Sequence, residues 1–187
     1  MTAKTTKLMN KAISNAISGL SGMVGKEIQI FAFDIKNVKV RNVAYEFGGP
    51  ESLIVGVYLQ IKGRAGHMFV GYEPKVAADL ITMLLGQAPV SMLQLSEMEQ
   101  SVLGEVGNLM GSFFLNALAA GAGMSLLPSP PAVMVDMAGA ILDVPLSHVL
   151  EQGDETPIIA ARFGTPDKQI EGKFLIVPIP AIEEKTD

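Results

Sequence analysis

Four polar residues at helical spacing in the middle of the chain could act together on a partner. On a helical wheel of ~100° per residue, these residues fall within about 60° of one another: Ser101, Glu105, Asn108 and Ser112. The spacing predicts a helix face that presents a carboxylate and a carboxamide side by side. An amide donates and accepts hydrogen bonds without adding charge, so such a face is suited to a polar partner. A solvated face of an amphipathic helix is the alternative.

Two glycines border this polar stripe on the wheel. Each of them, Gly104 and Gly111, costs the helix about 1 kcal/mol relative to alanine. We expect them to leave the face free of side chains that would hinder a partner. The opposite arc is apolar and predicts the buried side: Val102, Val106, Leu109, Met110, Phe113, Phe114 and Ala117.

Start and stop signals place this helix among the other elements. A capping box at Ser96 to Glu99 opens it, and it is expected to run to about Ala120. Further helices are predicted at about 6–24, from 73–74 to Gly86, and at about 139–150. Alternating or continuous apolar runs predict strands at 27–35, 38–47, 52–62, 67–72, 132–136, 157–163 and 170–177.

The order of these elements favours an α+β fold with a mainly antiparallel sheet flanked by long helices. The chain also resembles itself after a shift of 98 residues, which carries Asn10 onto Asn108 and Leu20 onto Leu118. Chance similarity is the alternative, because few identities match. We interpret residues 1–187 as one domain of two repeats, approximately 1–90 and 91–187, related by a pseudo-twofold axis.

Composition narrows the classes of function. The net charge is −5, and the scattered lysines and arginines form no basic stripe, so no nucleic-acid binding is expected. The chain has no cysteine and only two widely separated histidines, so no metal site is expected, and a reducing compartment fits. The polar N-terminus is unlike a signal peptide. The uncharged stretch 106–135 contains prolines and asparagines, so we expect a buried helix, a loop and a core strand rather than a membrane span.

One combination of residues resembles the active-site signature of the CheC, CheX and FliY phosphatases. That signature has Asp or Ser, then Glu four positions later, Asn three positions after the Glu, and Pro twenty-two positions after the Asn. Ser101, Glu105, Asn108 and Pro130 match all four positions. Further segments also look like CheC, so the resemblance covers most of the chain: 49–52, 103–108, 128–131, 136–143 and 170–172.

The resemblance implies a cytoplasmic phosphatase that hydrolyses the aspartyl phosphate of a CheY-type response regulator in chemotaxis. It implies that Asn108 positions the attacking water and that Glu105 docks a lysine of the regulator. Ser101 and Pro130 would support the geometry. The regulator would bring its own magnesium, and this chain would bind no cofactor or metal.

CheC proteins commonly carry two such sites, and here the resemblance departs from the pattern. The counterparts in the first repeat are Ala3, Lys7, Asn10 and Ala32, so only the asparagine remains and the glutamate position carries the opposite charge. We therefore predict one working site and a degenerate first site at Lys7 and Asn10.

Two further readings stay open. The chain could be a non-catalytic adaptor that binds the receptor deamidase CheD, with 136–143 as the candidate surface, or a flagellar switch component. A sensor of apolar ligands would rest only on the 11 methionines, which commonly fill gaps in cores.

Overall fold

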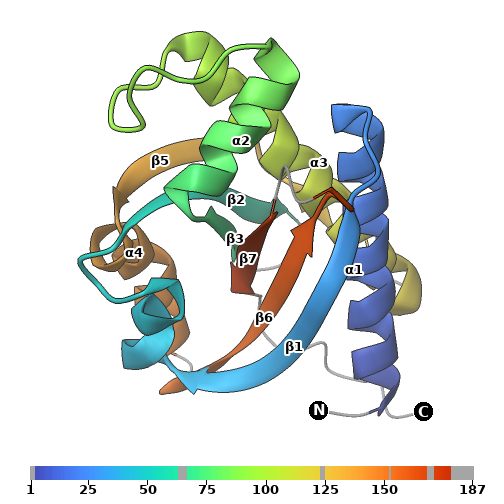
Figure 1. Ribbon diagram of the computed structural model, residues 1–187. Helices are drawn as coiled ribbons and strands as arrows, with labels where there is room; N and C mark the ends of the chain where they lie inside the picture. The colour runs from blue at the N-terminus through green and yellow to red at the C-terminus, as the bar shows by residue number, and fades with distance from the viewer. Residues whose placement is uncertain (1–2, 63–66, 123–124, 152, 168–170, 178–187) are drawn as a thin grey trace.

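The protein, described here from a computed structural model, places helices on both faces of an antiparallel sheet (Figure 1). The structure describes residues 3–62, 67–122, 125–151, 153–167 and 171–177. The helices are α1 (Ala3–Val24), the 3-10 helix η1 (Val40–Phe47), α2 (Pro74–Leu85), α3 (Glu97–Ala122) and α4 (Ala138–Leu150). The strands are β1 (Gln29–Lys39), β2 (Leu53–Lys62), β3 (His67–Tyr72), β4 (Leu127–Pro128), β5 (Ala132–Met137), β6 (Glu155–Gly164) and β7 (Glu171–Val177).

The sheet has seven strands in the order β1–β6–β7–β3–β2, and β4 and β5 both pair with β2 at the far edge. Every pairing is antiparallel. The predicted α+β class is therefore confirmed, and β2 is an interior strand of the sheet. β5 was expected to be a core strand, but it is an edge strand whose residues are half-buried or exposed.

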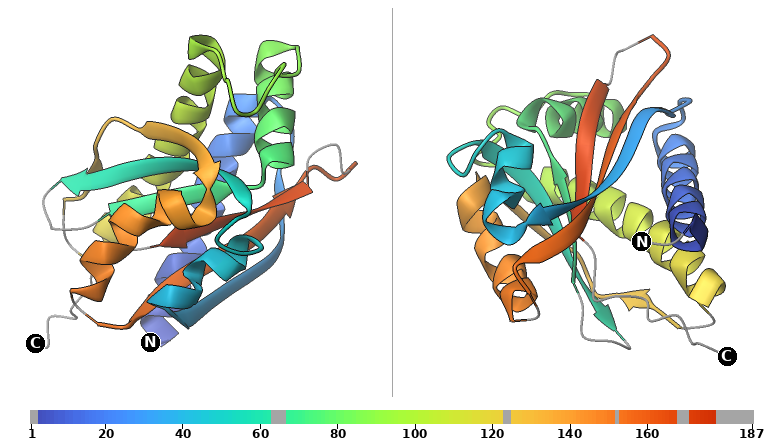
Figure 2. Two further views of the ribbon diagram at one scale, coloured as in Figure 1. Left: turned by 90° about the vertical axis from the view of Figure 1, so that its left-hand side faces the viewer. Right: turned by 90° about the horizontal axis from the view of Figure 1, so that it is seen from below.

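The alternation of side chains along the strands builds two cores, one on each face of the sheet. On β2, Val55, Val57 and Leu59 join the core beneath α1, α2 and α3, whereas Ile54 joins the core beneath η1 and α4. Figure 2 shows the same layers, with α1 and α3 on one side of the sheet and η1 and α4 on the other. The sheet therefore separates α3 from α4.

Helix ends follow the signals in the sequence. α1 is followed by Gly25 with φ of 67°, and α2 begins at Pro74 and ends at Gly86 with φ of 77°. Proline suits the first helical turn, and glycine adopts the left-handed conformation without strain. Within the described residues, none of these helices, including the weakly charged α3, has the length and apolarity needed to span a membrane.

The segment 38–47 was predicted as a strand, and most of that prediction is wrong. β1 ends at Lys39, and Val40–Phe47 forms the helix η1 instead. Its two buried residues, Val40 and Val43, are three positions apart, which matches the period of a 3-10 helix. The Val40 amide donates to the Asp154 carbonyl at 2.9 Å, so contact with the strand that pairs with β1 continues to the first residue of the helix. The β-branched residues that favoured a strand are buried equally well by this helix.

Apart from α2 and β4, the described elements follow the same order in both halves of the chain. Exchanging β1 with β5, β6 with β2 and β7 with β3 leaves the order of the sheet unchanged. The shift of 98 residues carries Lys39, the end of β1, onto Met137, the end of β5. It also carries Val40, where η1 begins, onto Ala138, where α4 begins. This symmetry is what an internal duplication would produce, and the duplication itself stays a prediction.

Candidate functional site

The predicted site lies on α3, whose first turn is fixed by a capping box. The Ser96 amide and hydroxyl donate to Glu99 Oε2 at 2.7 and 2.8 Å, and the Glu99 amide donates back to Ser96 Oγ at 3.4 Å. The Gln100 side chain also donates to the Leu95 carbonyl at 2.9 Å. These bonds satisfy donors that would otherwise lack partners at the helix start. The residue at which α3 begins is therefore fixed by local bonds.

Glycines let α3 lie very close to the sheet. A Cβ on Gly107 would lie 2.3 Å from Val57 Cγ1, and one on Gly111 would lie 2.5 Å from Leu59 Cδ1. Gly104 is buried as well, against β5 and the residues before it. The expectation that Gly104 and Gly111 open the face to a partner is thus wrong. Their missing side chains make room for the sheet.

The polar stripe faces away from this contact. Ser101 and Glu105 are exposed, and Asn108 and Ser112 are half-buried. Residues three apart on a helix have Cβ atoms about 5–6 Å apart, so Glu105 and Asn108 are neighbours on the surface. Among the described residues, Glu105 has no hydrogen bond or ion pair, so its carboxylate is free to receive a cation.

The Pro130 segment lies along one side of the stripe. Ser129 is attached to β2, because its amide donates to the Gln60 carbonyl at 2.7 Å and its hydroxyl accepts from the Gln60 amide at 2.9 Å. Pro130 itself is exposed, and it is Pro131 that meets the helix, with Cγ 3.4 Å from where a Cβ on Gly104 would lie. The segment between β4 and β5 therefore reaches α3 between Ser101 and Asn108.

α1 packs along the other side of the stripe. A Cβ on Gly19 would lie 2.5 Å from Phe113 Cδ2 and 2.9 Å from Leu109 Cδ2. Leu109 is half-buried, and Phe113 remains 40% exposed at the junction of the two helices. The carboxylate and the carboxamide thus lie on an exposed strip between the proline segment and α1.

The predicted first-repeat residues lie on α1 and β1. Lys7 and Asn10 are exposed on α1, and Ala32 is exposed on β1, while the side chain of Ala3 lies outside the described residues. Lys7 makes no ion pair with any residue that the structure describes. At the position 98 residues before Glu105, α1 therefore carries an exposed lysine in place of a carboxylate.

The chemistry available at the site is that of a carboxylate and an amide. Across the described ranges, no three histidine, aspartate or glutamate side chains come together as a metal site would require. The two histidines lie on different elements, His67 on β3 and His148 on α4. The exposed carboxylate of Glu105 can bind a cation, and the half-buried amide of Asn108 can orient a polar molecule beside it.

One exposed residue on the same face was not singled out in the sequence. Met98, in the first turn of α3, is 65% exposed. It lies three residues before Ser101 and seven before Glu105, a helical spacing that could have pointed to it. The wheel misses such a residue when only polar side chains are considered.

Comparison with known proteins finds a family model over the segment that carries the motif. The model of the CheC-like family matches residues 98–135, which include Ser101, Glu105, Asn108 and Pro130. Over 174 residues the chain is 25% identical to the CheY-P phosphatase CheC of Bacillus subtilis (strain 168), covering 91% of this chain and 83% of that protein. The chain is thus similar to the CheC-like family in the segment that carries the motif, and to a CheC protein over most of its length.

Solved structures share the fold of this chain. FliY of Thermotoga maritima matches with a TM-score of 0.70 and 22% identity, over 94% of this chain and 87% of that one. A chain of the FliG-FliM complex from H. pylori matches with a TM-score of 0.67 and 13% identity, over 96% and 92% of the two chains. At these identities the likeness concerns the fold alone.

Proposed function

We propose that this protein is a phosphatase that hydrolyses the aspartyl phosphate of a CheY-type response regulator. The observation that carries the proposal is the pair of the exposed Glu105 and the half-buried Asn108 on α3, within the segment that matches the family model. The name of the Bacillus subtilis relative, a CheY-P phosphatase, supports the choice of substrate. The chain would act in the cytoplasm.

Asn108 would position the attacking water. The oxygen of that water forms a bond to phosphorus, the bond from phosphorus to the aspartyl oxygen breaks, and inorganic phosphate and a free carboxylate result. Positioning is the main contribution that a protein makes to phosphoryl transfer. An amide suits this role because it can orient water and adds no negative charge that would repel the phosphoryl group.

The other residues of the motif would dock the regulator and support the geometry. Glu105 would pair with a lysine of the regulator, for which its free carboxylate is suited. Ser101 would sit at the edge of the contact, and Pro130 would hold the segment that ends at Pro131 against α3. The magnesium that phosphoryl transfer requires would come with the regulator, and no metal or cofactor is assigned to this chain.

The test is the loss of phosphate from a CheY-type regulator that has been phosphorylated with a small phosphodonor in magnesium. The wild-type chain should accelerate the loss. Asn108→Ala should abolish most of the acceleration while the far-UV circular dichroism spectrum stays unchanged. Asn10→Ala, at the related position on α1, is the matched control and should keep full activity. A crippling effect of Asn10→Ala with normal activity of Asn108→Ala would overturn the one-site proposal.

A second candidate is favoured by the likeness to the flagellar proteins. The fold matches FliY and a chain of the FliG-FliM complex, so a binding role in a flagellar switch is compatible with this architecture. An adaptor that binds CheD remains a further prediction. Regulator or CheD binding that persists in Asn108→Ala, with no phosphatase activity in the wild type, would favour the binding role.

A further inference from the structure

We propose that Met98 is a docking residue that binds an apolar surface patch of the same response regulator, beside the lysine that Glu105 receives. The inference rests on the proposed function, because it assigns a further contact to the same site. It concerns affinity for the regulator rather than the chemical step.

Met98 lies on α3 beside the polar stripe, near the start of the helix. Its side chain is 65% exposed, although methionine is a residue that cores readily accept. On the helical wheel it lies about 20° from Glu105 and about 60° from Ser101. Seven residues separate it from Glu105, which corresponds to about 10 Å along the helix axis. Met98 therefore continues the polar stripe at its N-terminal end.

A protein interface is large enough to include both Glu105 and Met98. A specific contact covers about 800 Å² on each partner, which is a disc with a radius of about 16 Å. A regulator centred on Glu105 must therefore cover Met98. Methionine is enriched in interfaces, whereas exposed carboxylates are depleted there. A large apolar side chain within this footprint gains more from contact than its charged neighbours do.

The segment before α3 also exposes apolar side chains. Val90 is fully exposed and Leu93 is 69% exposed. The same segment is anchored by the buried Leu95, whose carbonyl accepts from Gln100. Figure 1 shows this segment running from α2 to the start of α3, at the end of the molecule where the stripe begins. Exposed apolar side chains gathered at one end of a binding face are typical of a protein contact.

These contacts define the chemistry of the regulator surface that docks here. The regulator that fits would carry a lysine opposite Glu105 and an apolar patch about 10 Å from that lysine, opposite Met98. Glu97 is exposed beside Met98, so a basic rim around the patch would also fit. A regulator without the apolar patch would still be a substrate, but it would bind more weakly.

The experiment compares Met98→Ala with the wild type in the phosphatase assay, over a range of regulator concentrations. We expect the half-saturating concentration to rise about five- to tenfold with kcat unchanged, which is the signature of lost binding. Alanine and methionine are both good helix formers and the side chain is exposed, so the melting temperature should not change. Met98→Leu, which keeps an apolar side chain, should restore most of the affinity.

Leu150→Ala is the matched control. Leu150 is 57% exposed at the end of α4, on the other face of the sheet, and its removal should leave the half-saturating concentration unchanged. If the wild type shows no phosphatase activity, the proposed function itself fails. If the wild type is active and Met98→Ala has the wild-type half-saturating concentration, only the docking role of Met98 is refuted.

Discussion

Gly107 of α3 lies against Val57 of β2 so closely that a Cβ on the glycine would be 2.3 Å from Val57 Cγ1. Real Cβ atoms essentially never come that close to another heavy atom. Val57 is itself fully buried, and its branched side chain has few alternative rotamers. This contact fixes the distance between α3 and the sheet and so directs the Glu105 face toward solvent.

The close contact predicts the effect of adding one methyl group. Gly107→Ala should destabilise the protein by about 1–3 kcal/mol, because α3 or Val57 must move to relieve the overlap. The free energy of unfolding in urea measures this directly. The loss should be accompanied by reduced phosphatase activity if α3 shifts.

Gly104→Ala is the control within the same helix. A Cβ there would be 3.4 Å from Pro131 Cγ, an ordinary van der Waals distance. Alanine also favours the helix over glycine by up to ~1 kcal/mol, so this variant should be as stable as the wild type or more stable. Equal destabilisation by the two substitutions would show that helix propensity, rather than the contact with Val57, decides the outcome.

Most elements of the fold could be predicted because local signals and tertiary packing agree. The capping box at Ser96, the glycine at position 86 and the continuous apolar run of β2 each mark an element that the structure contains. The segment 40–47 could not be predicted in this way. Its spaced valines fit a strand and a 3-10 helix alike, and packing against α4 decides between them.

The candidate site was only partly predictable, because its surroundings also depend on packing that the sequence pattern does not show. A helical wheel gives the direction of each side chain but not the width of the buried arc. Gly104 and Gly111 border the polar stripe in projection, yet both are buried because the sheet approaches them. Likewise the spacing of Pro130 gave no sign that its neighbour Pro131 makes the contact with α3.

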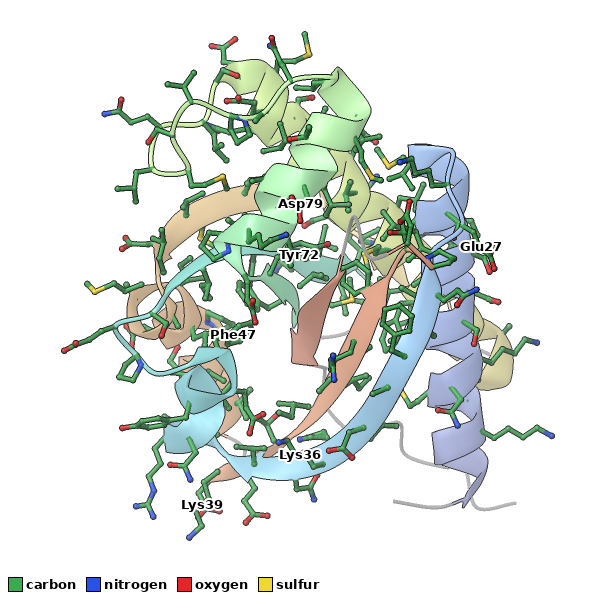
Figure 3. All side chains as sticks on the ribbon, viewed as in Figure 1. Glu27, Lys36, Lys39, Phe47, Tyr72 and Asp79 are labelled. Carbon is green, nitrogen blue, oxygen red and sulfur yellow. The ribbon has the colours of Figure 1, made fainter. Side chains whose placement is uncertain are left out.

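The buried tyrosine of β3 predicts how stability depends on pH. Tyr72, labelled in Figure 3, is fully buried, and its hydroxyl donates to the Met110 sulfur at 3.3 Å. Burial raises the pKa of this phenol above its ordinary value of 10.0. The unfolded chain releases the proton near pH 10 while the folded protein retains it. The contribution of the buried, protonated phenol to the free energy of unfolding is therefore complete below pH 10. As the pH rises further, this contribution is lost by up to ~1.4 kcal/mol per pH unit.

Tyr72→Phe should remove this dependence. At neutral pH the substitution should cost less than ~1 kcal/mol, because a thioether is a weak acceptor. Between pH 9 and 11 the free energy of unfolding should then fall less steeply than in the wild type. Tyr45→Phe, which removes a phenol that is 65% exposed, serves as the control. Identical slopes for the wild type and Tyr72→Phe would contradict the assignment.

The exposed carboxylate of Glu105 predicts how docking depends on salt. An ion pair with the regulator's lysine is screened as the Debye length falls from about 10 Å at 0.1 M to about 3 Å at 1 M salt. The half-saturating regulator concentration of the wild type should therefore rise with ionic strength. Glu105→Gln should raise it about two- to fivefold at low salt, as expected for an exposed pair, and should make it nearly independent of salt.

Charge reversal tests whether the lysine is the partner. Glu105→Lys places a cation opposite the regulator's lysine, so the two like charges repel. It should weaken docking at low salt more than Glu105→Gln does, and added salt should partly restore the affinity. Glu151→Gln removes an exposed carboxylate after α4 and should behave like the wild type. If all three variants shared the wild-type dependence on salt, Glu105 would not bind a cation of the regulator. Its place in the motif would then need a structural explanation within α3.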